Sequence, residues 1–215
     1  MIGVPLHADI VLPYLLPDGT DELKMKYIPK MVSGEYIGAI AMTEPGAGSD
    51  LQGMRTTAVD QDDYYLVNGS KTFITNGYLS DVIVVAVKTD PGKGAKGISL
   101  LAIDKDMTGF TKGVPFEKVG LHAQDTCELF FEDVKVPKAN LLGKVGEGFK
   151  YLMTELAQER LVVALAAVAL GEYMLQATID YVKQRKAFGK SISDFQNTRF
   201  KLAEMTAALE QGRIY

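Results

Sequence analysis

The chain has 215 residues and a formal net charge of −4, from 23 basic and 27 acidic side chains. This balance gives no general attraction to nucleic acid or to an anionic membrane surface, so we expect neither as a partner. The single cysteine, Cys127, cannot form an internal disulfide, which favours a reducing compartment and a buried structural role for the thiol. No Cys, His or carboxylate cluster has metal-ligand spacing, so we expect no metal.

The apolar runs are too short for a membrane. The most apolar stretch is Val162 to Leu170, well below the ~18 residues that a membrane-spanning helix needs. The first residues do not combine a basic region with an apolar core, so we expect no signal peptide.

The first 34 residues have helical features. Met1 to Leu16 is typical of the end of a helical region. Thr20 is placed to cap a short helix that runs through Lys26, with acidic residues in its first turn. Pro29 can open a further short turn, which Ser33 and Gly34 would end.

From Tyr36 to about Val136 the pattern changes to short strands. The turn Asp60 to Asp63 predicts a hairpin, and Asn68-Gly69 is a strong turn signal. No helical pattern interrupts this region, which favours an antiparallel barrel or sandwich within an α+β fold. The expected strands are 36–42, 54–59, 64–67, 71–75, 82–87, 97–103 and 127–134.

Two long helices follow. Glu147 to about Lys186 has no proline, and Gly189 is placed to stop this helix. Ser193 and Gln196 have the spacing of a capping box for a second helix, which runs towards Ile214. Apolar residues around Val162 to Leu170 cover more than one face, so both helices need packing partners beyond each other.

The most informative segment is the loop Met42-Thr43-Glu44-Pro45-Gly46-Ala47-Gly48-Ser49-Asp50. Its small residues let backbone N–H groups come close to a phosphate or an aromatic ring. An ordinary Pro-Gly turn explains the composition about as well.

Three other segments allow both a functional and a purely structural interpretation. Phe73 to Gly77 could form one wall of a flat cofactor site, or simply end a strand. Glu159 falls within an apolar row of its helix, where a carboxylate is partly desolvated and a stronger base, but most helical glutamates are solvated or ion-paired. The segment Arg185 to Lys190 could bind an anion, or be a solvated basic helix end.

Taken together, these segments resemble the acyl-CoA dehydrogenase family. The resemblance is carried by Met42 to Asp50, by Asn68 to Gly77 and by Gln184 to Lys190, in matching order and spacing over essentially the whole chain. Three segments are most similar to the long-chain members: Gly38 to Met42, Ala123 to Thr126 and Glu128 to Asp133.

The resemblance implies a domain organisation. Residues 1–33 would end an N-terminal helical domain, residues 34–137 would form the β-barrel domain that binds flavin and substrate, and residues 138–215 would supply the first two helices of a C-terminal four-helix bundle. The chain would then be a fragment of the family fold, and we expect it to bind FAD weakly and turn over slowly by itself.

The resemblance also implies site residues. FAD would be held by Ile40, Ala41, Met42, Thr43, Gly48, Ser49, Phe73, Ile74 and Thr75, while Arg185 and Gln196 would reach the FAD of a neighbouring subunit. Ser49, Lys96, Gly97 and Arg160 would contact the substrate. Glu159 would be the catalytic base, because long-chain and isovaleryl members carry a glutamate at this place, directly before an arginine.

The implied activity is FAD-dependent dehydrogenation of an acyl-CoA, of long chain length, to a trans-2-enoyl-CoA in fatty acid β-oxidation. Electrons would pass to an electron-transfer flavoprotein, and the protein would be a homo-oligomer, tetrameric in the full-length family, in the bacterial cytoplasm or the mitochondrial matrix. Two alternatives stay open: a non-catalytic flavin-binding or assembly module, and an acyl-CoA oxidase that uses oxygen as acceptor.

Overall fold

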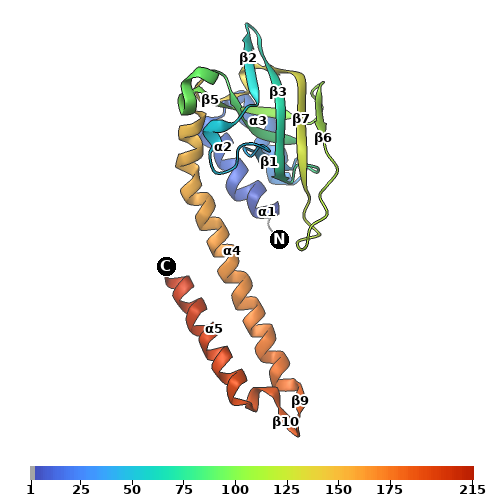
Figure 1. The fold of residues 1–215 in the computed structure, drawn as a ribbon, viewed down its shortest axis with the longest axis vertical. Coiled ribbons are helices and arrows are strands. Elements are labelled where there is room, and N and C mark those ends of the chain that lie inside the picture. Colours follow the sequence, from blue (N-terminus) through green and yellow to red (C-terminus); the bar gives the residue numbers. More distant parts are fainter. Residues whose placement is uncertain (1–2) are drawn as a thin grey trace. The chain divides into compact units, whose positions relative to one another are not determined.

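The chain divides into two compact units, Met1–Ala157 and Gln158–Tyr215, and the computed structural model describes residues 3–215. The first unit contains the N-terminal helices and an eight-stranded sheet (Figure 1). The second unit is helical apart from one small hairpin. Helix α4 (Gly148–Gln184) begins in the first unit and continues in the second. The expected α+β class is therefore confirmed.

The N-terminal helices follow one another with almost no loop between them. They are α1 (Gly3–Pro5), the π-helical turn η1 (Leu6–Val11), α2 (Leu12–Asp18) and α3 (Asp21–Ser33). This agrees with the helical character expected for Met1 to Leu16, of which Met1 and Ile2 lie outside the described residues.

Helix α3 begins and ends where the sequence indicates. The Thr20 hydroxyl accepts a hydrogen bond from the Leu23 N–H at 3.3 Å, and Gly34, at a φ of +78°, ends the helix. The expected break at Pro29 is wrong, because α3 runs straight through it. Proline removes one backbone donor and its ring crowds the carbonyl four residues earlier, but its fixed φ is close to a helical value, so the helix continues through it.

The sheet is mixed rather than purely antiparallel, because β1 and β2 run parallel to β4. Its strands follow the order β6-β7-β3-β2-β4-β5-β8, and β1 also pairs with β4. Their bounds are β1 (Gly38–Ala41), β2 (Thr57–Gln61), β3 (Tyr64–Thr75), β4 (Val82–Lys88), β5 (Ile98–Asp104), β6 (Phe110–Lys112), β7 (Thr126–Pro137) and β8 (Leu141–Leu142). Single 3-10 turns occur at η2 (Leu51–Gly53) and η4 (Lys138–Asn140), and the longer 3-10 segment η3 (Pro91–Gly97) is interrupted at Gly94, which has non-helical dihedral angles.

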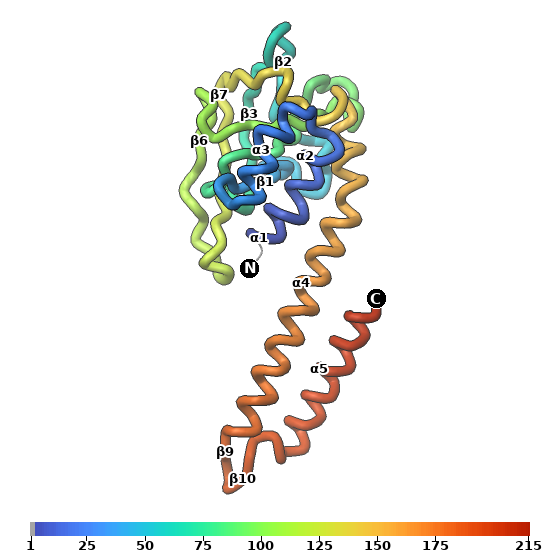
Figure 2. The backbone as a smooth tube through the Cα atoms, turned by 180° about the vertical axis from the view of Figure 1, so that it is seen from behind, coloured from blue at the N-terminus to red at the C-terminus, as the bar shows by residue number. Residues whose placement is uncertain are grey.

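Strands β4 and β5 are buried on both faces. Val82, Val84 and Ala86 of β4 face the cluster that contains the N-terminal helices and Leu152 of α4. The alternate residues Ile83 and Val85 face a second cluster, formed with β3, β6 and β7. Figure 2 shows the helices α2 and α3 on one side of the strands. This double coverage explains why the two strands are almost uninterrupted apolar runs.

The β2–β3 hairpin confirms the predicted turn, with Tyr64 opposite Gln61. The turn predicted at Asn68-Gly69 is wrong, because both residues lie inside β3. Gly69 has a φ of +146° and lies where the register between β3 and β7 shifts, as in a β-bulge. A β-carbon at Gly69 would come within 2.7 Å of the Thr56 Cα. Gly69 therefore allows the backbone of Thr56 to approach closely inside a strand. Asn-Gly is also the typical sequence of a turn, so the dipeptide alone does not distinguish the two uses.

The second unit consists of the C-terminal part of α4 and helix α5 (Gln196–Ile214), joined by the hairpin β9 (Lys186–Ala187) and β10 (Lys190–Ser191) and by the 3-10 turn η5 (Ile192–Asp194). The two helices run side by side, with Leu209 packed against Gly171 (Figure 2). Gly189 lies in the hairpin and not at the end of α4. The expected cap at Ser193 is also wrong: Asp194 accepts from the Ser191 N–H at 3.1 Å, and α5 begins at Gln196.

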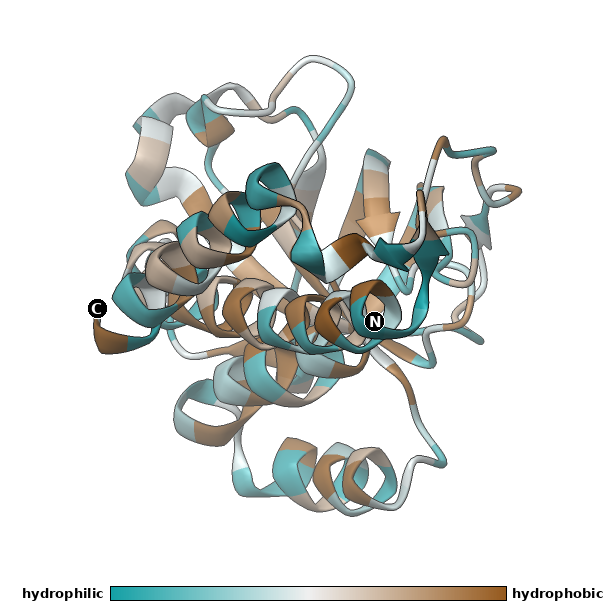
Figure 3. Ribbon diagram, turned by 90° about the horizontal axis from the view of Figure 1, so that it is seen from below, coloured by the Kyte–Doolittle hydropathy of each residue, from teal (hydrophilic) through white to brown (hydrophobic). Residues whose placement is uncertain are grey.

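The helices of the second unit expose apolar side chains on more than one face, as expected. Val163, Leu165, Leu170, Tyr173 and Met174 are all more than half exposed, and the apolar residues are brown in Figure 3. By length and composition alone α4 would be able to cross a membrane, which corrects the expectation that no stretch qualifies. Core helices of soluble proteins pass the same test, so it assigns no span by itself.

The crowding at Gly69 yields a prediction. Gly69→Ala should lower the free energy of unfolding by about 1–3 kcal/mol, because a new β-carbon would overlap Thr56 and the left-handed φ would be strained. Gly120→Ala is the matched control, since a β-carbon there meets open space. Thermal unfolding followed by circular dichroism measures both, and equal midpoints for the two variants would contradict the proposed close approach.

Candidate functional site

The loop Met42 to Asp50 is folded into a tight turn at its centre. Glu44 and Ala47 exchange two backbone hydrogen bonds, Glu44 N–H to Ala47 O at 2.9 Å and Ala47 N–H to Glu44 O at 3.1 Å. The loop is also tied to β3, because the Thr72 N–H donates to Thr43 O at 2.9 Å. Gly48 and Ser49 are exposed, so one side of an ordered loop faces outwards.

A buried ion pair lies beneath this loop. The ammonium group of Lys71, on β3, donates to Glu44 Oε1 at 2.8 Å and to Met42 O at 3.1 Å. The two side chains are only 0% and 6% exposed. Glu44 also accepts from the backbone N–H groups of Arg55 at 2.6 Å and Thr56 at 3.0 Å. Burial alone would raise the pKa of the Glu44 carboxyl, but the charge of Lys71 and these hydrogen bonds hold this pKa below its usual range.

Packing within the part of the chain that the structure describes does not require glycine at two positions of the loop. A β-carbon at Gly46 or at Gly48 would meet no atom of these described residues within 4 Å beyond its chain neighbours, and neither residue has a left-handed φ. By contrast, Gly97 is crowded by the backbone of Asp90. The missing side chains at Gly46 and Gly48 therefore keep the outer surface of the loop clear, which fits close approach of a flat or phosphorylated ligand.

Phe73 is presented outwards near the end of β3. It has a φ of +58°, which is unusual for a bulky residue, and it lies where the register with β7 shifts between Lys71 and Ile74. Its ring is 68% exposed and lies 5.6 Å from the ring of Phe116. Strained backbone and an exposed aromatic ring together support a binding role at this strand end.

The neighbours of Phe73 differ in accessibility. Ile74 is buried in the core, as are Ile40 and Ala41 on β1, so these residues offer a ligand mainly their backbone atoms. Thr75 is half-buried, and its hydroxyl accepts from the Gln124 amide at 3.2 Å. The Gln124 Oε1 atom is buried and has no hydrogen-bond partner among residues 3–215.

The other predicted site residue pair in this unit is Lys96 and Gly97, at the end of η3. Lys96 is exposed and Gly97 is buried. The Gly97 carbonyl accepts from the Thr89 N–H at 2.9 Å, so its backbone closes the turn. Their assignment to the substrate stays a prediction.

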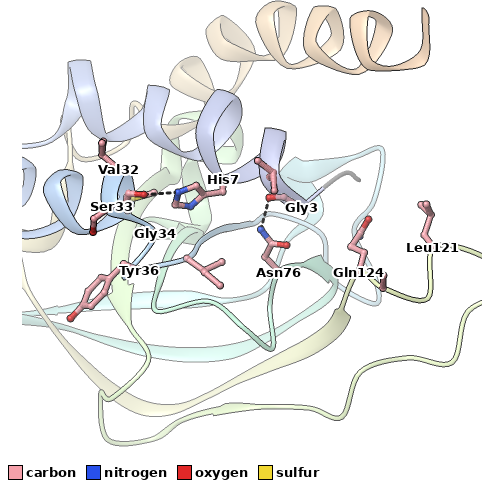
Figure 4. Close-up of a pocket in the computed structure, with 13 residues that line it drawn as sticks. Gly3, His7, Val32, Ser33, Gly34, Tyr36, Asn76, Leu121 and Gln124 are labelled. Carbon is pink, nitrogen blue, oxygen red and sulfur yellow. Dashed lines mark hydrogen bonds between the residues drawn. The ribbon is translucent and has the colours of Figure 1, made fainter. Parts of the chain in front are cut away.

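A cavity of about 720 Å³ lies between η1, the end of α3 and the loop that follows Gly120 (Figure 4). His7 and Asn76 lie at its inner side: His7 Nε2 is 3.0 Å from Met31 O, and the Asn76 amide donates to Gly3 O at 2.8 Å. None of the predicted site residues lines this cavity. It is therefore distinct from the outward-facing surface of the loop Met42 to Asp50.

In the second unit the predicted residues differ in exposure. Glu159 is 9% exposed, whereas Gln158 and Arg160 on either side are exposed. Arg185 is exposed directly after α4, and Gln196 is exposed at the first position of α5. Burial distinguishes Glu159 from a solvated helical glutamate, although periodicity alone favoured a solvated or ion-paired side chain. Its role as the base stays a prediction.

Cys127 is fully buried on β7. Burial raises the pKa of its thiol to about 11, which leaves little thiolate near neutral pH. This agrees with a packing role rather than a nucleophilic one.

The chain matches two family models. The acyl-CoA dehydrogenase middle domain matches residues 39–134, and the acyl-CoA dehydrogenase C-terminal domain matches residues 146–215. The chain belongs to the acyl-CoA dehydrogenase family. The first match covers the sheet with the loop Met42 to Asp50, and the second covers α4 and α5.

Individual members of the acyl-CoA dehydrogenase family are close in sequence and structure. The long-chain specific acyl-CoA dehydrogenase of Sus scrofa is 53% identical over 94% of this chain and 48% of its own length. The isovaleryl-CoA dehydrogenase of Solanum tuberosum is 43% identical over 97% of this chain and 51% of its own. A crystal structure of an acyl-CoA dehydrogenase from Geobacillus kaustophilus has a TM-score of 0.96 and 59% identity, covering 100% of this chain and 57% of that one. The chain spans about half the length of these relatives.

The acyl-CoA dehydrogenase motifs did not identify the ion pair beneath the loop. Glu44 is part of the loop motif and Lys71 of the strand motif, but neither was singled out. One signal was present: Lys71 lies four residues after the buried Val67 of β3, on the inward-facing side of the alternation. A lysine at an inward position needs a buried counter-charge.

The ion pair generates a pH prediction. Because the folded pKa of Glu44 is lowered, its contribution to stability is present above the unfolded pKa and is lost as the pH falls through the folded pKa. Glu44→Gln should cost about 3–5 kcal/mol at neutral pH, because Lys71 is left without its counter-charge. The gap between wild type and variant should close at acid pH.

Urea unfolding between about pH 7 and about pH 3 measures this gap. Glu117→Gln, at an exposed glutamate, is the control and should leave stability unchanged at every pH. A wild type and a Glu44→Gln variant whose stabilities differ by the same amount over the whole range would contradict the assignment.

Proposed function

We propose that this chain forms the flavin-binding and base-carrying part of an enzyme that dehydrogenates acyl-CoA thioesters to trans-2-enoyl-CoA with FAD. The observation that carries the proposal is the burial of Glu159, directly before Arg160, in a chain of the acyl-CoA dehydrogenase family. The proposed domains are the predicted ones: residues 1–33, 34–137 and 138–215.

FAD would be held by the loop and by the strand end next to it. The residues proposed are Ile40, Ala41, Met42, Thr43, Gly48 and Ser49, with Phe73, Ile74 and Thr75. The clear outer surface beside Gly46 and Gly48 and the exposed ring of Phe73 support this assignment. When bound, FAD supplies the acceptor for the hydride that leaves the substrate β-carbon. Arg185 and Gln196 are proposed to reach the FAD of a neighbouring subunit.

Glu159 is proposed to act as the base. Its carboxylate would take the proton from the carbon next to the thioester carbonyl, while the β-carbon loses its hydride and the double bond forms between the two carbons. Such a proton is weakly acidic, so the base has to be strong for a carboxylate. The burial of the Glu159 side chain supports this role, because it shields the carboxylate from bulk water, which would otherwise compete for it.

We assign Ser49, Lys96, Gly97 and Arg160 to the CoA thioester. All of these residues except Gly97 are exposed, which supports the assignment. Similarity is higher to a long-chain specific relative than to an isovaleryl-specific one, which favours a long acyl chain.

Partners and location follow from the same proposal. Electrons would pass to an electron-transfer flavoprotein, and the exposed apolar faces of α4 and α5 favour a homo-oligomer. The relatives include mitochondrial proteins and one of bacterial origin, so the mitochondrial matrix or the bacterial cytoplasm is proposed.

Replacing the base tests the mechanism. Glu159→Gln should bind FAD as wild type does, but anaerobic addition of long-chain acyl-CoA should bleach its flavin at least about 100-fold more slowly. Glu155→Gln, one turn earlier on α4 and partly exposed, is the matched control and should bleach at the wild-type rate. Stopped-flow absorbance in the visible range measures both in a single turnover.

Other outcomes of this experiment decide against the proposal. Bleaching that survives in Glu159→Gln removes Glu159 from the role. A wild-type protein that takes up no FAD would refute the proposed enzyme function. A wild-type protein that takes up FAD but is not bleached by any acyl-CoA would be a non-catalytic binding module. Rapid reoxidation of the bleached protein by air alone indicates an oxidase.

Chain length is tested with matched substrates. Wild-type protein reconstituted with FAD should be bleached faster by a long-chain acyl-CoA than by isovaleryl-CoA, by at least about tenfold, because several buried methylene groups each add about 0.8 kcal/mol of binding. Equal rates, or the reverse order, would assign the chain to the short branched-chain type.

A further inference from the structure

The ion pair of Glu44 and Lys71 joins three separate segments of the chain. Lys71 lies on β3, Glu44 lies in the loop, and the Glu44 carboxylate also accepts the N–H groups of Arg55 and Thr56, which precede β2. Because Lys71 donates to Met42 O as well, the residues on both sides of Thr43 are held from below. Thr43 O in turn accepts from the Thr72 N–H.

The same lysine also lies at the start of the bulge that presents Phe73. The register with β7 shifts directly after Lys71, and Phe73 follows two residues later with its left-handed φ. Lys71 therefore holds the loop through its hydrogen bonds and lies two residues before the exposed aromatic ring, at the start of the bulge that presents it.

Stability alone gives a weak reason for this pair. Burying two charges has a large desolvation penalty, and well-packed apolar residues of the same volume are often as stabilising or more so. What an apolar pair cannot do is direct hydrogen bonds. Here they fix the Met42 carbonyl and the Glu44 side chain, and through them the backbone between the two residues.

We propose that Glu44 and Lys71 are positioning residues for the flavin: they set the loop Thr43 to Ser49 and the bulge at Phe73 in the binding geometry before FAD arrives. The inference rests on the proposed FAD site. A loop that is already ordered does not lose conformational entropy when the ligand binds. Removing the ion pair that orders it should therefore appear mainly as weaker FAD binding.

The test uses the neutral, volume-conserving double variant Glu44→Gln/Lys71→Met, which leaves no buried charge unpaired. It should unfold within a few degrees of wild type but bind FAD at least about tenfold more weakly, measured by quenching of flavin fluorescence. A second measurement follows backbone amide hydrogen exchange of Thr43 to Ser49 in FAD-free protein, where protection should be lost.

Lys112→Met is the matched control. The Lys112 ammonium group also donates to carbonyl oxygens, those of Tyr78 and Ser80, but lies on β6, away from the loop. This variant should lose thermal stability and keep the wild-type dissociation constant for FAD. Comparing its FAD affinity with that of the double variant shows whether any buried lysine's hydrogen bonds matter for FAD binding or only those that position the loop.

Three results would overturn the inference: a double variant that binds FAD as wild type does, unchanged hydrogen exchange in the loop, or equal losses of FAD affinity in the double variant and in Lys112→Met. A wild-type protein that binds no FAD would instead refute the proposed function. In that case the hydrogen exchange of the FAD-free proteins still decides whether the pair orders the loop.

Discussion

The carboxylate of Glu44 and the ammonium group of Lys71, at 2.8 Å and almost fully buried, hold together the part of the fold that carries the candidate site. Burying two charges is only tolerable when their hydrogen bonds are satisfied, and here backbone groups of Met42, Arg55 and Thr56 complete them. This leaves a loop that is rigid underneath and bare on its outer side, which is a combination that a plain glycine turn does not provide.

Sequence periodicity predicted the element types well, because most of them obey local rules. The strands β4 and β5, the Thr20 cap and the β2–β3 hairpin all follow from residue pattern and turn chemistry. Two of the errors occurred at residues whose type has more than one structural use. Gly69 serves a close approach inside β3, and Pro29 stays within α3, since a glycine or a proline alone does not say which of its properties the fold employs.

The candidate site was predictable only as a set of motifs. Periodicity placed Glu159 in an apolar row but favoured a solvated or paired side chain, and the resemblance to the acyl-CoA dehydrogenase family reversed that judgement. The structure adds its burial. The left-handed φ of Phe73 depends on the register between β3 and β7, which no local pattern gives. The inward position of Lys71 indicated a buried counter-charge but not that Glu44, 27 residues earlier, supplies it.

The strand β4 separates two independent cores, since its alternate residues face the helices and the inside of the curled sheet. A volume change at Val84 would therefore disturb one compartment, and a change at Val85 the other. Gly46 and Gly48 of the loop are not constrained by packing in this way, because side-chain atoms added there would meet only open space. Substitutions at these two glycines can therefore change which ligand the loop accepts without altering the packing of either core.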